Sequence, residues 1–61
     1  MVATLIVRRP SGATRVLEAD RCVVEHGLVT ARGCWRSPTG RLSAPQTYTW
    51  DRRRIVEIRW R

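Results

Sequence analysis

The ten residues Cys22–Ala31 read CVVEHGLVTA, and their pattern predicts a β-hairpin. Two runs rich in β-branched residues flank His26-Gly27, a dipeptide whose glycine supplies the positive φ of a two-residue hairpin turn. The predicted pairs are Glu25 with Leu28, Val24 with Val29, and Cys22 with Ala31. One face of this hairpin is apolar and is continued by Gly33 and Trp35, while the other face is mixed. The antiparallel register is therefore self-consistent.

Turn signals recur along the rest of the chain at the spacing of short strands. The segments RPSGAT and RSPTGR combine proline with glycine, and TWDRR is a weaker signal. They delimit five predicted strands: Val2–Arg9, Thr14–Ala19 continuing or bending into Cys22–Glu25, Leu28–Trp35, Gln46–Trp50 and Arg53–Trp60. The stretch Ala19–Arg21 breaks the alternation and predicts a bulge or sharp bend, so the second strand is either continuous or divided in two.

The first hairpin has a less regular pattern than the second. A turn is predicted at Ser11-Gly12. Its pairs are Ile6 with Leu17 and Val7 with Val16. Both faces then carry apolar pairs, so this hairpin is either covered on both sides or lies where the sheet curls.

These strands predict an all-β protein with one domain, residues 1–61. With no helix to cover the apolar face, the sheet is expected to curl into a small open barrel of the SH3 or OB sort, or to pair with a second copy. A core of this size is marginal, which keeps disulfides, a metal and assembly of several copies under consideration.

The beginning of the chain contains no signal-peptide pattern, and no apolar run approaches the length of a membrane span. The expectation is a soluble, cytoplasmic protein that does not enter a membrane.

The residues Cys22, His26 and Cys34 are too few and too irregularly spaced for a zinc site, which normally shows paired ligands. In the predicted register Cys22 points to the core and His26 lies in the turn. Cys34 points to the face of the sheet opposite to Cys22, which argues against a disulfide between the two cysteines. Free thiols, no metal and no cofactor are expected.

Catalysis is not predicted. The chain has one histidine, no glycine-rich phosphate loop, and five scattered acidic residues. The protein is expected not to be an enzyme.

The net charge of the chain is +7, and its basic residues other than His26 are twelve arginines with no lysine. Lysine, asparagine and phenylalanine are all absent, which indicates the coding bias of a high-GC genome and explains the choice of arginine. That bias does not explain why acidic residues number only five. The excess of positive charge indicates an anionic partner.

The densest group of arginines lies in the last segment, YTWDRRRIVEIRW, Tyr48–Trp60. Its alternating end favours a strand, although Asp51 could instead cap a helix. A strand places Val56, Ile58 and Trp60 in the core and leaves Glu57, Arg59 and Arg61 in solvent.

The sequence thus predicts a small nucleic-acid-binding barrel that contacts phosphates with little sequence specificity. The predicted binding residues are Arg52, Arg53, Arg54, Arg59, Arg61, Arg8, Arg9 and Trp50. Tryptophans in so small a chain are more often core residues, and Trp50 followed by Trp35 is the best candidate for stacking on a base.

Two alternatives stay open. One is a protein-interaction module or small accessory or inhibitor protein, of bacterial, plasmid or phage type, that binds an acidic protein surface. The other is a homo-oligomer whose basic face forms on assembly.

Overall fold

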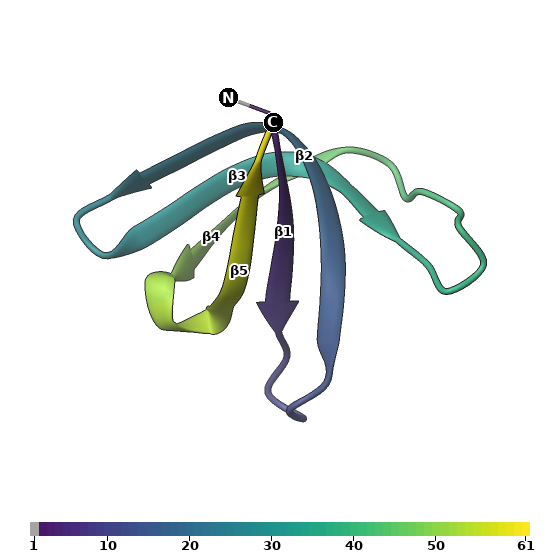
Figure 1. The fold of residues 1–61 in the computed structure, drawn as a ribbon, viewed down its shortest axis with the longest axis horizontal. Coiled ribbons are helices and arrows are strands. Elements are labelled where there is room, and N and C mark those ends of the chain that lie inside the picture. Colours follow the sequence, from purple (N-terminus) through teal and green to yellow (C-terminus); the bar gives the residue numbers. More distant parts are fainter. Residues whose placement is uncertain (1) are drawn as a thin grey trace.

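Five antiparallel strands and one short 3-10 helix make up most of residues 2–61, the part of the chain that this computed structural model describes (Figure 1). The elements are β1 (Ala3–Arg8), β2 (Thr14–Glu25), β3 (Leu28–Arg36), β4 (Gln46–Asp51), the 3-10 helix η1 (Arg52–Arg54) and β5 (Ile55–Trp60). They form one sheet in the order β4-β3-β2-β1-β5, so β5 returns to the free side of β1. Within residues 2–61 the edge strands β4 and β5 do not pair with each other, which leaves the curled sheet open and confirms the predicted all-β open barrel.

The hairpin of β2 and β3 has the predicted register. Val24 pairs with Val29 and Cys22 with Ala31, and the turn residues His26 and Gly27 have φ angles of 51° and 75°. Both central residues of the turn therefore have the positive φ of a turn that matches the twist of the strands.

The interruption predicted at Ala19–Arg21 is a bulge within one continuous strand. Ala19 pairs with Gly33 and Arg21 with Arg32, so that Asp20 is the extra residue of β2. A bulge adds local twist to the strand that carries it. Beyond this point β2 turns away from β1, and the β2–β3 hairpin extends to the left of the view (Figure 1).

The register predicted for the first hairpin is wrong by one residue. Leu5 pairs with Leu17, and Ile6 pairs with Val16. The turn has three residues between Arg9 and Ala13, rather than two, and Gly12 closes it with a φ of 90°.

The physical reason is the proline at the start of this turn. Pro10 presets φ for the second position of a β-turn, and the backbone N–H of Gly12 donates to the carbonyl of Arg9 at 2.9 Å. Relative to β1, the shift by one residue places each side chain of β2 on the other face of the sheet. Leu5 and Leu17 are consequently buried, whereas Ile6 and Val16 lie half-buried on the outer face.

The core lies inside the curl of the sheet and consists of small and medium-sized apolar side chains. Its buried members are Ala3, Leu5, Val7, Leu17, Ala19, Cys22, Val29, Ala31 and Ile55. Four partly buried side chains pack against it: Trp35, Tyr48, Trp50 and Ile58. The aromatic residues thus close the core on the side of β4, and apolar burial of this kind is the main stabilising contribution in so small a domain.

The last segment is a strand, as predicted, but its inward residues differ from the prediction. Ile55 is buried opposite Val7, and the register of β5 against β1 shifts at the next pair, which leaves Val56 exposed at an irregularity. Ile58 contacts the core as expected. Trp60 pairs with Ala3 at the end of the sheet and is 46% exposed. The predictions of Val56 and Trp60 as core residues are therefore wrong.

No helix in residues 2–61 has the length and apolar character needed to cross a membrane.

Candidate nucleic-acid interface

The three consecutive arginines lie in η1, the short connection between β4 and β5. Asp51 caps this helix, because its carboxylate accepts a hydrogen bond of 2.9 Å from the backbone N–H of Arg53. This bond, and then a second one from the Arg53 side chain, holds the pKa of the Asp51 carboxyl below its usual value. The guanidinium group of Arg53 stays largely in solvent, with 91% of the side chain exposed.

The other two arginines of η1 bind backbone carbonyls. Arg52 donates from Nη1 to the carbonyl oxygen of Ile55 at 3.0 Å. Arg54 donates from Nε to the carbonyl oxygen of Arg8 at 3.0 Å. Because of the second bond, η1 lies against the end of β1, and the structure brings Arg54 next to Arg8.

The predicted residues Arg59 and Arg61 lie elsewhere, at the far end of β5. Arg59 forms an ion pair with Glu57. Arg61 donates from Nη2 to the Thr4 hydroxyl at 2.6 Å and to the Glu18 carboxylate at 2.8 Å. The predicted arginines therefore form two groups, one at η1 with the end of β1 and the other on the outer face of β5, β1 and β2.

Two adjoining cavities include arginines from both groups, Arg9 from the first and Arg59 and Arg61 from the second. The first cavity, of about 440 Å³, is lined by Arg9, Thr14, Arg15, Val16, Arg36, Ser37 and Pro38. The second, of about 510 Å³, is lined by Thr4, Ile6, Val16, Glu18, Arg36, Arg59 and Arg61. The two adjoin, since both are lined by Val16 and Arg36. We call this feature the basic furrow.

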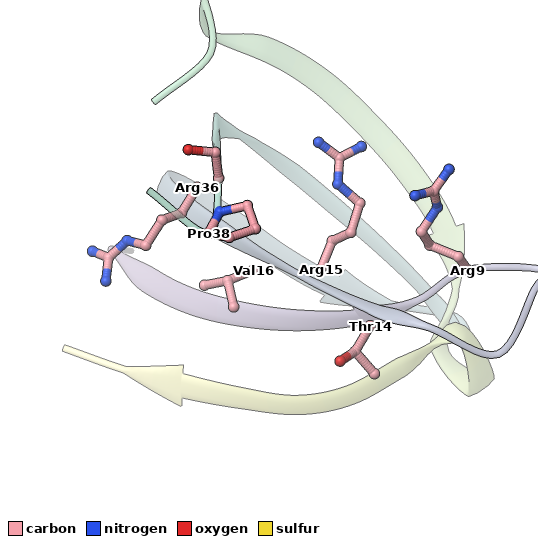
Figure 2. A pocket seen from close by; sticks show the side chains of 7 residues that line it. Arg9, Thr14, Arg15, Val16, Arg36 and Pro38 are labelled. Atoms are coloured by element: carbon pink, nitrogen blue, oxygen red, sulfur yellow. The ribbon is translucent and has the colours of Figure 1, made fainter. Parts of the chain in front are cut away.

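The walls of the basic furrow carry five guanidinium groups and one carboxylate, that of Glu18. Figure 2 shows Arg9 and Arg15 extending in the same direction, with Arg36 at the opposite end of the first cavity. The lining of the basic furrow also includes the apolar side chains of Ile6 and Val16. The furrow thus combines positively charged and apolar lining residues.

Glu18 organises the second cavity. Its side chain is 17% exposed, and its Oε2 atom lies 2.8 Å from Nη2 of Arg61 and 3.4 Å from Nη2 of Arg36. A carboxylate between two guanidinium groups fixes their positions, and each of them keeps further N–H groups with which to bind an anion.

Two arginines of the furrow, Arg15 and Arg36, were not among the predicted binding residues. Each is separated along the chain from the dense group at residues 52–61, so the local density of charge does not reveal it. The signal that could have found Arg36 is the register, because Arg36 pairs with Val16 of β2. That pair lies beyond the bulge at Asp20, where the register of β2 against β3 has shifted by one residue.

Trp50, the predicted stacking residue, belongs to an aromatic cluster with Trp35 and Tyr48. The rings of Tyr48 and Trp50 are stacked at 5.3 Å between centroids, and Trp35 meets Trp50 edge-on at 5.8 Å. The arginine that lies over an aromatic ring is Arg15, whose guanidinium carbon is 4.5 Å from the centre of the Trp35 ring. The contact between arginine and tryptophan thus involves the second candidate, Trp35.

Five arginines in the described part of the chain form ion pairs with carboxylates. Within residues 2–61, seven have no carboxylate within 4.0 Å: Arg8, Arg9, Arg15, Arg21, Arg41, Arg52 and Arg54. Two of the unpaired arginines, Arg9 and Arg15, line the basic furrow.

Both cysteines are free. Cys22 pairs with Ala31 in the core, and burial raises the pKa of its thiol. Cys34 pairs with Glu18 on the other side of the bulge and is partly buried. Residues 2–61 contain no group of three or more His, Cys, Asp or Glu side chains that could hold a metal ion.

Comparison of the chain with protein-family models, with curated proteins and with solved structures finds no match.

Proposed function

We propose that this protein is a small nucleic-acid-binding barrel that holds the phosphate backbone along the basic furrow. One observation carries the proposal: two adjoining cavities are lined by five arginines and a single carboxylate. These arginines come from β2, β3, β5 and the residues directly after β1 and β5. Since chain charge alone does not require such convergence, the placement supports an extended polyanion as the ligand.

The arginines of η1 extend this surface. Arg54 contacts the end of β1 through the carbonyl of Arg8, and Arg9 follows as the first arginine of the furrow. A strand of nucleic acid that leaves the furrow beyond Arg9 would therefore pass Arg8 and η1. Contacts of this kind, to phosphates and without base-edge readout, give little sequence specificity.

The test is a titration of fluorescently labelled random-sequence DNA and RNA at about 50 and 200 mM salt. If the ligand's phosphates pair with about five arginines, the affinity for a single strand should fall roughly a hundredfold between these salt concentrations, because each neutralised phosphate releases counterions. Absence of binding at the lower salt, or an affinity that salt does not change, would contradict the proposal.

Two variants test whether binding occurs at the basic furrow. Arg9→Gln removes an unpaired arginine of the furrow and should weaken binding and reduce the slope of log affinity against log salt by about 1. Arg32→Gln is the matched control, since Arg32 pairs with Asp20 at 3.0 Å and does not line the furrow. Equal losses in the two variants would mean that net charge, and not the furrow, determines the affinity.

A second candidate function rests on the open edges of the sheet. Both β4 and β5 have one side without a partner strand in residues 2–61. An acidic protein segment could add to such an edge as a further strand, and a second copy of the chain could do the same. Capture of one stoichiometric protein after nuclease treatment would favour the first of these, and an assembly that dissociates on dilution would favour the second.

A further inference from the structure

Arg15 and Trp35 form a preorganised pair at the edge of the basic furrow. The guanidinium carbon of Arg15 lies 4.5 Å from the centre of the indole ring, within the range of a cation–π contact. Arg15 is exposed, has no carboxylate partner in the described chain, and lines the first cavity together with Arg9 and Arg36.

The indole beneath Arg15 is held in place by other aromatic residues. Its Nε1–H donates to the hydroxyl of Tyr48 at 2.8 Å, and that hydroxyl donates to Oε1 of Gln46 at 3.2 Å. Trp50 meets the same indole edge-on. Because Trp35 is fixed on these sides, the guanidinium group that lies on it loses less conformational freedom when a ligand binds.

A guanidinium group is planar, so a second flat group can stack on the face that the indole does not cover. Nucleobases stack on arginine planes and on aromatic rings when they are unpaired. In a duplex the faces of the bases are covered by their neighbours, and a protein on the backbone reaches only phosphates.

We infer that the ligand of the basic furrow is single-stranded nucleic acid, and that one of its bases stacks on Arg15 above Trp35 while Arg9, which extends beside Arg15 (Figure 2), binds an adjacent phosphate. This inference rests on the proposed function and adds to it a preference for single strands. It assigns to Arg15 a role that positive charge alone does not provide.

Replacement of arginine by lysine separates these two contributions, because lysine keeps the charge and lacks the plane. The experiment compares the wild type with Arg15→Lys at about 50 and 200 mM salt, on labelled oligonucleotides of deoxythymidine and of uridine and on a DNA duplex. Arg32→Lys is the matched control outside the furrow. The urea midpoints of both variants show whether the substitutions leave the fold intact, which the exposure of Arg15 leads us to expect.

The wild type should bind at least one of the two single strands more tightly than the duplex. Arg15→Lys should weaken binding to that strand by about fivefold or more, the effect of losing one stacked base, and should leave duplex affinity and the salt slope unchanged. The strand with the larger effect identifies the preferred sugar.

Two results would overturn the inference while leaving the proposed function in place. One is an equal loss on single strands and duplex, which would make Arg15 a phosphate ligand only. The other is full affinity of Arg15→Lys for every probe. If the wild type binds none of the probes at low salt, the proposed function itself fails.

Discussion

Gly33 lies where β3 passes closest to the bulge in β2. A Cβ atom at this position would lie 2.2 Å from the carbonyl oxygen of Glu18 and 2.7 Å from Cα of Ala19. Both neighbours are backbone atoms, so neither can move aside without a shift of β2. The residue is glycine because of this close approach, and not because of an unusual φ angle.

We expect Gly33→Ala to destabilise the protein by about 1–3 kcal/mol, the range for forcing an extra group into a packed site. The measurement is the urea midpoint followed by circular dichroism. Gly40→Asn is the control, because Gly40 has a φ of 86° with no atom within 4 Å of a built Cβ, and asparagine tolerates that backbone conformation. A Gly33→Ala midpoint equal to that of the control would contradict the predicted clash.

At the scale of elements, the connection from β4 to β5 depends on a charged cap. The ionised carboxylate of Asp51 accepts the Arg53 backbone N–H and pairs with the Arg53 side chain. These contacts lower the pKa of Asp51 in the folded protein. Its contribution to stability is therefore complete above the pKa of the unfolded chain, about 3.9, and is lost as the pH falls through the lower folded pKa.

Asp51→Asn should accordingly reduce stability at neutral pH, and the difference from the wild type should shrink as the pH falls from about 4 to about 2. Urea midpoints across this range measure it. Glu25→Gln removes the same charge without removing a contact of η1 and serves as the control. A difference between wild type and Asp51→Asn that stays constant down to the lowest pH would show that the charge of the cap does not matter.

Across the whole molecule, arginines outnumber the carboxylates that could neutralise them. The net charge of the chain is +7. Arg21 of β2 lies directly opposite Arg32 of β3, so that like charges face each other. Exposed ion pairs contribute little, whereas self-repulsion opposes the compact state. A surface of this kind is unfavourable for folding and favourable for binding a polyanion.

We expect the melting temperature of the free protein to rise by a few degrees when NaCl is increased from about 10 to about 200 mM, because salt screens the repulsion. Arg21→Glu should raise the melting temperature at low salt and reduce its dependence on salt, since it replaces a like-charge cross-strand pair by an opposite-charge pair. A melting temperature that falls with added salt would mean that the ion pairs outweigh the repulsion.

Much of the fold could be predicted because its signals are local. The turn at His26-Gly27 and the break of alternation near Asp20 each depend on residues adjacent in the chain, and both appear where the pattern placed them. The register of the first hairpin could not be obtained in this way. Turns of two and three residues both fit the segment around Gly12, and a difference of one residue exchanges the two faces of the sheet.

The candidate site, like the fold, could be predicted from the sequence only in part. The density of arginine at residues 52–61 is visible in the chain, and so is the excess of charge. The furrow is not visible there, because Arg36 comes from a different segment than Arg9 and Arg15 and lies near them only when β3 pairs with β2.

Periodicity, turn chemistry and charge are properties of neighbouring residues, so the chain alone predicts an all-β protein, the turn of its longest hairpin and an excess of positive charge. Contacts between strands establish which arginines lie together, that Arg15 rests on Trp35, and that Val56 and Trp60 lie outside the core. These outcomes depend on register and curvature, which are set by contacts between strands and not within them.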